Sequence, residues 1–264
     1  EGNPVLDASD LPEGMSRNDF RDPKIWQEAD GTYRCVVGTR IPDKEGAILL
    51  FSSPDGFKWK YESILIRNDG RFGMMWECPD FFELDGRHVL LCSPQDMLPE
   101  GFEYHNGNGT LCLIGQMDAE RKHFTYEHNQ SVDYGIDFYA PQTLLAPDGR
   151  RIMIAWMQSW ESSHDHATAS KWFGMMTLPR ELSLKEGRLI QKPVRELEKY
   201  RQNGVFYTDV DVQQRLQLPS VQGRCVDMTV NVHPSGGRLY DKFIIKVAKD
   251  TRFYTSIIYE PGES

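Results

Sequence analysis

The sequence predicts an all-β fold of the β-propeller type, and two observations carry this prediction. Short segments rich in β-branched and aromatic residues recur between glycine, aspartate and proline positions, and long helical periodicity is absent. A strand–turn–strand pattern also returns several times along the first part of the chain, as blades do in a propeller. The segments expected to form strands include 33–37, 47–51, 88–92, 110–114 and 151–156.

Each repeat begins with a proline, which opens a short apolar strand, and a turn that ends in glycine leads to a second strand. The prolines are Pro23, Pro79, Pro141 and Pro179, and the turn glycine follows them after 8, 7, 8 and 8 residues. The separations between successive prolines are 56, 62 and 38 residues. Acidic-Gly pairs between strands indicate hairpins, because glycine adopts the positive φ that tight turns require. Four repeat units are therefore expected. A β-sandwich with coincidental turn spacing is the alternative.

The chain changes character after about residue 195. Residues 1–195 are interpreted as a partial propeller that carries the catalytic site, and residues 196–264 as a linker and the start of a C-terminal β-sandwich. Residues 195–202 form a short charged stretch with a helical pattern. Strand-like alternation follows in 205–218, 224–233 and 240–259, without the Pro…Gly repeat. This length is short for a complete sandwich.

Composition excludes several classes of function. The 264 residues include 30 Lys+Arg and 39 Asp+Glu, which gives a net charge of −9. Such a chain has no general attraction for phosphate backbones, so we expect no nucleic-acid partner. No run approaches the roughly 18–20 apolar residues that a membrane helix needs, so we expect no membrane partner.

The cysteines and histidines indicate neither disulfides nor a metal site. The five cysteines are odd in number and scattered, and no pair has zinc-site spacing. No apolar leader opens the chain, so we expect reduced thiols and a cytoplasmic protein. His164-Asp165-His166 lies in a polar stretch, which we interpret as a solvated loop. We therefore expect no metal and no cofactor.

Acidic residues stand close to three of the repeat prolines. Asp22 directly precedes Pro23, Glu77 lies two residues before Pro79, and Asp137 lies four residues before Pro141. The innermost strands of a propeller line its central channel, so matching positions should converge at one mouth. Clustered carboxylates disfavour one another's ionisation, and one of them should keep its proton. A carboxylic acid beside a carboxylate is the arrangement that glycoside hydrolysis uses.

Aromatic residues surround these acids, as they do in many sugar sites. The set is Phe20, Trp26, Phe72, Trp76, Phe138, Tyr139 and Trp160. Aromatic faces pack against sugar C–H surfaces, and Arg21 beside Asp22 offers a donor–acceptor pair for hydroxyl groups. For any one residue the plain alternative is a surface ion pair or a core tryptophan. Three acids near the repeat prolines favour a functional site.

Five stretches together resemble the β-fructosidases of glycoside hydrolase family 32, among them the bacterial sucrose-6-phosphate hydrolases. The stretches are Phe20-Arg21-Asp22-Pro23-Lys24, Met75-Trp76-Glu77-Cys78-Pro79-Asp80-Phe81-Phe82, Gly135-Ile136-Asp137-Phe138-Tyr139-Ala140-Pro141-Gln142, Trp156-Met157-Gln158-Ser159-Trp160 and Met176-Thr177-Leu178-Pro179-Arg180-Glu181-Leu182. The resemblance covers about residues 15–200. It implies a five-bladed propeller followed by a β-sandwich, and retaining hydrolysis through a covalent fructosyl intermediate without a metal.

The resemblance also assigns roles to individual residues. Glu77 resembles the general acid/base, and Asp22, helped by Arg21, resembles the residue that stabilises the transition state. Three further residues resemble positions around the sugar or the acid/base: Asp137, Trp160 and Cys78. The implied partner is a small sugar, namely sucrose, sucrose 6-phosphate or a fructan.

One motif of the family is absent from the sequence. The nucleophilic aspartate of the family lies in Trp-x-Asn-Asp-Pro-Asn-Gly, and Asn18-Asp19-Phe20 is only superficially similar to it. The chain thus resembles a member that lacks its first blade, its nucleophile and much of its sandwich. Three hypotheses remain: a β-fructofuranosidase chain acting on sucrose 6-phosphate or sucrose, a non-catalytic carbohydrate-binding propeller fragment, and a propeller that binds only protein. The oligomeric state stays open.

Overall fold

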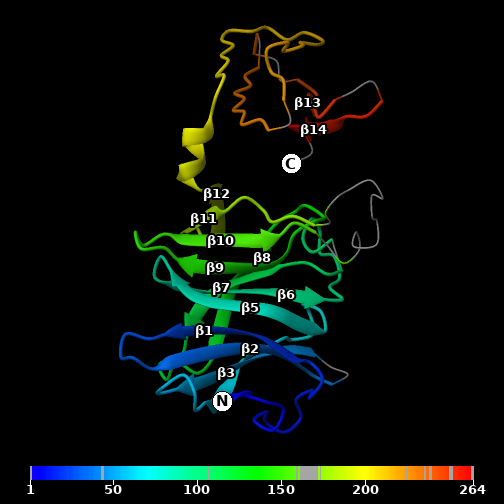
Figure 1. Ribbon diagram of the computed structural model, residues 1–264. Coiled ribbons are helices and arrows are strands. Elements are labelled where there is room, and N and C mark those ends of the chain that lie inside the picture. The colour runs from blue at the N-terminus through cyan, green and yellow to red at the C-terminus, as the bar shows by residue number, and fades with distance from the viewer. Residues whose placement is uncertain are drawn as a thin grey trace. The chain divides into compact units, whose positions relative to one another are not determined.

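The computed structural model describes residues 2–42, 45–105, 107–158, 160, 172, 174–223, 225–234, 236–237, 240–249 and 252–262. The chain divides into two compact units, Glu1–Arg195 (unit 1) and Glu196–Ser264 (unit 2). Unit 1 contains three four-stranded antiparallel sheets, which follow one another along the chain (Figure 1). The all-β prediction is confirmed.

Each sheet is a meander of strands in chain order. The first sheet consists of β1 (Phe20–Gln27), β2 (Tyr33–Ile41), β3 (Glu45–Ser53) and β4 (Lys60–Arg67). The second consists of β5 (Met75–Leu84), β6 (Arg87–Gln95), β7 (Leu111–Met117) and β8 (Phe124–Ser131). The third consists of β9 (Tyr139–Leu145), β10 (Arg151–Trp156), β11 (Arg180–Lys185) and β12 (Arg188–Pro193).

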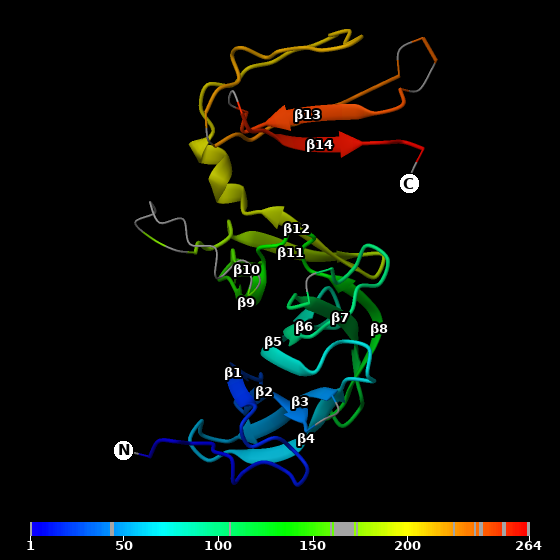
Figure 2. The same cartoon turned by 90° about the vertical axis from the view of Figure 1, so that its right-hand side faces the viewer.

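The sheets are arranged as successive propeller blades. Their first strands β1, β5 and β9 lie on the same side of unit 1, and β5 contacts both β1 and β9 (Figure 2). Pro23, Pro79 and Pro141 all lie in these first strands, as the repeat predicts. The fold class is thus a β-propeller type, and three blades are present in the described part of unit 1.

The prediction of four repeat units is wrong. Pro179 directly precedes β11, and the hairpin β11–β12 forms the outer half of the third sheet. A strand–turn–strand pattern looks the same in an inner and an outer hairpin, so the Pro…Gly spacing does not separate them. The shorter separation of 38 residues between Pro141 and Pro179 marks the difference. The resemblance implies five blades, and the sequence led us to expect four of them in this chain. The described structure has three.

Two apolar clusters hold the blades together. The cluster between the first and second sheets includes the fully buried residues Ile48, Trp76 and Leu113. The cluster between the second and third sheets includes Leu91, Ile114 and Met153. Burying one such side chain contributes about 1.5–3 kcal/mol, so the stability of unit 1 depends on blade-to-blade packing.

Two glycines allow β5 to approach the first sheet closely. A Cβ atom at Gly38 would lie 2.2 Å from the backbone oxygen of Trp76, and one at Gly46 would lie 2.5 Å from the Trp76 ring. The indole Nε1 of Trp76 donates to the backbone oxygen of Phe72 at 2.6 Å, which fixes the ring. Trp76 is therefore a core residue, and its fixed position also fixes the backbone of the neighbouring Glu77.

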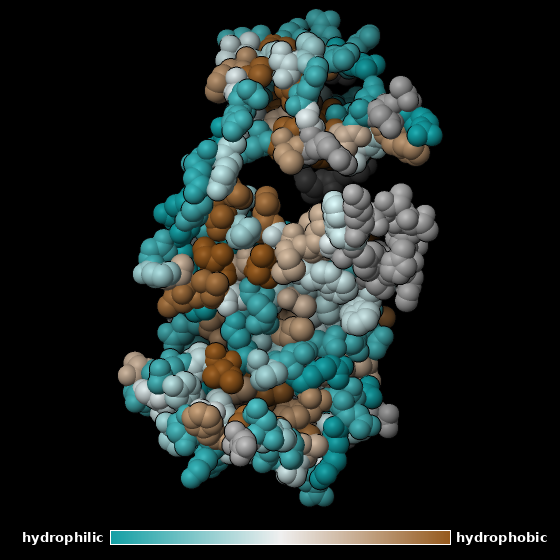
Figure 3. All heavy atoms as spheres, viewed as in Figure 1, coloured by the Kyte–Doolittle hydropathy of each residue, from teal (hydrophilic) through white to brown (hydrophobic). Residues whose placement is uncertain are grey.

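The end blades differ in how their apolar side chains are covered. On the first sheet, Leu6, Leu11 and Met15 of the segment before β1 pack against Leu49 and Phe51. On the third sheet, Leu144 and Leu145 of β9 and Ile154 of β10 are exposed, as are Met175 and Met176 between β10 and β11. Figure 3 shows hydrophobic side chains gathered over the region of β9 and β10.

The 3₁₀ helix η1 (Arg195–Tyr200) spans the boundary between the units, in the stretch where the sequence shows a helical pattern. The described residues of unit 2 contain one two-stranded sheet, β13 (Phe243–Val247) with β14 (Thr255–Tyr259). The described residues of 205–218 and 224–233 form no strands, contrary to the alternation in the sequence. The start of a sandwich stays a prediction. Within the described residues, no helix has the length and apolar character to span a membrane.

Candidate active site

The first strand of each blade bends at its proline. The residue directly before the proline has a left-handed backbone in all three blades, with φ values of 62° at Asp22, 48° at Cys78 and 50° at Ala140. The strand register shifts at the same places, between positions 21 and 24 of β1 and between positions 77 and 80 of β5. A β-bulge of this kind re-aims the flanking side chains. Residues two before the proline therefore face one another across blades.

These facing residues form the first polar layer, which consists of Arg21, Glu77 and Tyr139. Arg21 Nε donates to Glu77 Oε1 at 2.9 Å, and the Tyr139 hydroxyl donates to Glu77 Oε2 at 2.6 Å. Glu77 is 8% exposed and Tyr139 is 3% exposed, whereas the Arg21 side chain is one third exposed. Each of the three blades contributes one member. The Glu77 carboxylate is therefore enclosed by Tyr139 and Arg21, and of these two partners only Arg21 is partly exposed.

Arg21 is held from its other side by Asp19. Arg21 Nη1 lies 3.0 Å from Asp19 Oδ1, and Arg40 Nε lies 2.7 Å from Asp19 Oδ2. The hydroxyl of Ser16 also donates to Asp19 Oδ2 at 3.0 Å. Partial burial acts to raise the pKa of Asp19, but the bonds from Arg21 and Ser16 and the charge of Arg40 outweigh it and lower the pKa. Both oxygens of Asp19 are thus engaged.

Asp22 lies one residue beyond the first layer and contacts Cys78. The backbone N–H of Cys78 donates to Asp22 Oδ2 at 3.0 Å, and the Cys78 Sγ lies 3.5 Å from the same oxygen. Burial, together with the charge of Asp22, raises the pKa of the Cys78 thiol to about 12. The thiol is therefore neutral near pH 7 and donates to the aspartate. This contact places Asp22 beside the residue that follows Glu77.

A second polar layer lies one residue after the prolines and consists of Lys24, Asp80 and Gln142. Lys24 Nζ lies 3.2 Å from Asp80 Oδ1 and donates to Gln142 Oε1 at 3.1 Å. The backbone N–H of Thr143 donates to Asp80 Oδ2. Asp80 is fully buried. The second layer ties three blades together below the first layer.

Of the other two predicted residues, Trp160 packs against the first polar layer and Asp137 is exposed before β9. Trp160 is 46% exposed, and its ring meets Tyr139 and Trp156 edge-on at centroid distances of 6.2 and 6.4 Å. Asp137 lies in a bend before β9 and is exposed. The three acids of the sequence analysis do not occupy equivalent positions, because the positions that match Glu77 hold Arg21 and Tyr139. Two of these acids, Asp22 and Glu77, come together.

Sequence reasoning missed Tyr139 as a partner of Glu77, and Ser93 behind it. Tyr139 was named only as a neighbouring aromatic residue, although it stands two residues before Pro141, as Glu77 does before Pro79. Ser93 was not singled out; its backbone oxygen accepts from the Tyr139 hydroxyl at 3.2 Å, and its Oγ accepts from the N–H of Ala140 at 3.0 Å. Counting from the proline, rather than looking for acids, would have found the tyrosine.

The part of the chain that the structure describes contains no group of three or more His, Cys, Asp or Glu residues placed to hold a metal ion. The stretch His164-Asp165-His166 lies outside the described residues. The charged groups of the site are instead satisfied by one another and by backbone groups.

Comparison with known proteins identifies the family of this site. The glycosyl hydrolases family 32 N-terminal domain matches residues 1–193. The chain belongs to glycosyl hydrolase family 32. Its sequence is 44% identical over 191 residues to the sucrose-6-phosphate hydrolase of Escherichia coli, an alignment covering 72% of this chain and 39% of that protein. It is 36% identical to the raffinose invertase of Escherichia coli, over 92% of this chain and 50% of that protein.

Solved structures of the family share the fold. A β-fructofuranosidase of family 32 from Bombyx mori superimposes with a TM-score of 0.70 and 41% identity, over 78% of this chain and 43% of that one. A variant of the same enzyme has been solved in complex with sucrose. The sucrose-6-phosphate hydrolase from Lactobacillus gasseri gives a TM-score of 0.62 at 28% identity. This family 32 chain spans half or less of the length of these relatives.

Proposed function

We propose that unit 1 carries the acid/base and stabilising part of a site that releases fructose from sucrose or sucrose 6-phosphate. The observation that carries the proposal is the first polar layer, in which Arg21 and Tyr139 hold both oxygens of the buried Glu77. Family membership and the named activities of the relatives support it.

Glu77 is the proposed general acid/base. A carboxyl group in this role gives a proton to the leaving glycosidic oxygen and later takes one from water. In the structure both oxygens accept hydrogen bonds, one from Arg21 and one from Tyr139. For the first step Glu77 carries a proton and turns one oxygen from Tyr139 or Arg21 towards the substrate. Of the two partners of Glu77, Arg21 is the one that is partly exposed.

Asp22 is the proposed stabiliser of the positively charged, oxocarbenium-like sugar. Its Oδ2 is fixed by the backbone N–H of Cys78, so the carboxylate is held in place before substrate arrives. Arg21 supplies donors for sugar hydroxyls beside it. We place Asp137 and Trp160 at the edge of the sugar site, Trp160 because its ring packs against Tyr139.

A retaining reaction also needs a nucleophile that accepts the fructosyl group. The family's Trp-x-Asn-Asp-Pro-Asn-Gly motif is absent from these 264 residues. Asp19 is a poor substitute, because Arg21, Arg40 and Ser16 already occupy its carboxylate. We propose that this segment contributes no nucleophile. This observation favours a second candidate function for the segment alone, which is carbohydrate binding without turnover.

The test is the release of fructose from sucrose and sucrose 6-phosphate by the 264-residue chain, with binding of both sugars measured by calorimetry. Glu77→Gln is the decisive variant, and Glu83→Gln is its matched control on the same strand, with an exposed side chain. Turnover that Glu77→Gln abolishes and Glu83→Gln preserves would place a nucleophile within this chain. Binding without turnover would establish the second function. Neither binding nor turnover by the folded chain would contradict both.

A further inference from the structure

A chain of four alternating charges ends at Glu77. Arg40 Nε lies 2.7 Å from Asp19 Oδ2. Asp19 Oδ1 accepts a hydrogen bond from Arg21 Nη1 at 3.0 Å, and Arg21 Nε donates to Glu77 Oε1 at 2.9 Å. Burial acts to lower the pKa of Arg21, but its bonds to both acids outweigh burial and raise that pKa. Arg21 is thus one cation that two carboxylates share.

Arg21 makes a single hydrogen bond with Glu77. Only the Nε of the arginine reaches the carboxylate, and the other oxygen of Glu77 accepts from the Tyr139 hydroxyl. In the described part of the chain, Nη2 of Arg21 makes no hydrogen bond. One arm of the guanidinium therefore stays available to another partner.

Two other arginine–glutamate pairs of this chain use two arms of the guanidinium. Arg71 donates from Nε and Nη2 to the two oxygens of Glu100, and Arg195 does the same to Glu181. Two parallel bonds are the common geometry of a guanidinium beside a carboxylate. Within the described residues, what distinguishes Arg21 from these two arginines is a second acid on its Nη1. This second acid is the feature that can account for the single bond.

That second acid, Asp19, is held in place by the first blade alone. Its backbone N–H donates to Ser16 Oγ at 3.1 Å, and the same hydroxyl donates to Asp19 Oδ2 at 3.0 Å. The backbone N–H of Ser16 donates to the backbone oxygen of Arg40 at 2.9 Å, which ties this segment to the end of β2. The position of the Asp19 carboxylate therefore does not depend on Glu77.

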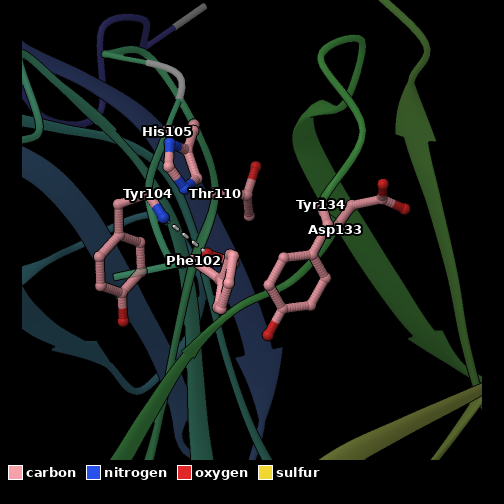
Figure 4. Close-up of a pocket in the computed structure, with 8 residues that line it drawn as sticks. Phe102, Tyr104, His105, Thr110, Asp133 and Tyr134 are labelled. Carbon is pink, nitrogen blue, oxygen red and sulfur yellow. Dashed lines mark hydrogen bonds between the residues drawn. The ribbon is translucent and has the colours of Figure 1, made fainter. Parts of the chain in front are cut away.

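The other side of Glu77 is closed. Tyr139 is 3% exposed, and Ser93 behind it is fully buried. The pocket lined by Thr110, whose Oγ1 lies 3.5 Å from Ser93 Oγ, has a volume of about 30 Å³, room for about one water molecule (Figure 4). Because Arg21 is the partly exposed partner of Glu77, the geometry of this arginine decides what the carboxyl group can offer.

We propose that Asp19 is a positioning residue for Glu77. By holding Nη1 of Arg21, it limits Arg21 to one bond with Glu77 and keeps the carboxyl group able to take and give a proton. Without Asp19, the guanidinium turns and gives Glu77 two bonds, which favour the ionised carboxylate over the protonated acid. The link to proton transfer rests on the proposed function, whereas the competition of two acids for Arg21 does not.

The test is a double-mutant cycle of Arg21→Gln and Glu77→Gln, measured in the parent protein and again in Asp19→Asn. Urea unfolding gives the unfolding equilibrium constant of each variant, and the cycle isolates the coupling between Arg21 and Glu77. If Asp19 competes for Arg21, the coupling factor should rise about fivefold or more in Asp19→Asn. If Asp19 only anchors the segment before β1, its loss loosens Arg21, and the coupling stays the same or falls.

Asp133→Asn is the matched control. Asp133 pairs with Arg180 Nη1 at 2.7 Å, and its side chain is 25% exposed, against 22% for Asp19. This control should leave the coupling between Arg21 and Glu77 unchanged. Asp19→Glu keeps the negative charge and should return the coupling to the value of the parent protein.

The cycle reports on Asp19 whether or not the chain cleaves sugar. Coupling that is unchanged or lower in Asp19→Asn would overturn the proposal and leave the proposed function standing. Should Asp19→Asn not fold, Asp19→Ser removes the same charge, keeps a hydroxyl beside Ser16, and is expected to raise the coupling as well. Raised coupling with an undiminished kcat for any fructose release would overturn the link to proton transfer, and with it the acid/base role proposed for Glu77.

Discussion

The two polar layers of unit 1 lie on the same three strands, on opposite sides of the same three prolines, yet they differ in what they leave accessible. In the first layer, Arg21 remains one third exposed beside Glu77. In the second layer, Asp80 is fully buried, and Lys24 reaches it from a side chain that is 23% exposed. One repeated bend therefore builds a layer with one partly exposed member and a layer around a fully buried carboxylate on the same strands.

This difference follows from burial more than from residue type. Both layers contain one acidic and one basic side chain, and in both a third blade supplies a neutral partner, Tyr139 or Gln142. Removing one partner of a buried ion pair is costly, because the other charge is left uncompensated away from water. A pair that keeps one side open remains able to exchange a protein partner for a substrate. The comparison predicts opposite consequences for mutations in the two layers.

The largest effect on stability is expected in the second layer. Asp80→Asn leaves Lys24 without its buried counter-charge and should lower the free energy of unfolding by about 3 kcal/mol or more. Urea unfolding followed by tryptophan fluorescence measures it. The control Glu127→Gln breaks an exposed pair with Arg87 and should cost less than about 1 kcal/mol. Equal losses of unfolding free energy in both variants would show that the second layer contributes no more to stability than an exposed ion pair.

An intermediate effect is expected in the first layer. Tyr139→Phe removes the hydroxyl that donates to Glu77 and should cost about 1 kcal/mol of stability, because the carboxylate keeps Arg21 as a partner. Any rate of fructose release that the 264-residue chain shows should fall about tenfold, since Glu77 loses one of its two orienting bonds. Tyr126→Phe, which removes a hydroxyl 3.4 Å from Asp69 at the surface, is the control. A stability loss as large as that of Asp80→Asn, without a loss of rate, would make the first layer structural too.

The smallest effect on stability is expected for Cys78, which lies between the two layers. This effect is absent near neutral pH and develops at alkaline pH. Its thiol has a pKa of about 12 in the folded state, against 9.0 when unperturbed. The folded state therefore keeps a proton that the unfolded state loses, so stability is lost as pH rises from about 9 towards 12, with a slope of at most about 1.4 kcal/mol per pH unit for this group. Cys78→Ala should flatten the dependence of the unfolding midpoint on pH in that range. An unchanged slope would show that Asp22 and burial do not hold the thiol neutral.

Thiol labelling tests the same environment at pH 8. Cys78 is partly buried, whereas Cys225 is exposed in unit 2. We expect a disulfide reagent to modify Cys225 more than tenfold faster than Cys78, because the thiolate is the reacting form. Variants that keep one of the two cysteines distinguish the rates.

The sequence allowed the strands and two of the site residues to be predicted, because apolar alternation and the turn glycines are visible in it. Strands β2, β3, β6, β7 and β10 all fall where the pattern places them. The motif residues Asp22 and Glu77 also come together, as expected for the first strands of neighbouring blades. Their chemical roles stay predictions.

The left-handed backbone before each proline cannot be predicted from the sequence. For this reason the sequence did not identify Tyr139 as a partner of Glu77. In regular strands, Asp22, Glu77 and Asp137 would be expected at similar places near the channel. Because the backbone bends before each proline, the residues at the position equivalent to Glu77 are Arg21 and Tyr139. In unit 2 alternation predicted the strands within 240–259, but elsewhere it was a poor guide, because alternating residues form a strand only when a neighbouring strand pairs with them. Residues 205–218 have no such neighbour in the described structure.

The bend before each proline also bears on how such a site can change over generations. A left-handed backbone at a non-glycine residue costs about 1 kcal/mol or more, and three blades bear that cost at Asp22, Cys78 and Ala140. The bend sets the direction of the side chain before it through the main chain, whichever residue type stands there. An arginine, a glutamate and a tyrosine already occupy that place in three successive blades. In a propeller with this bend, the side chain at that place can differ from blade to blade while the path of the strand stays the same.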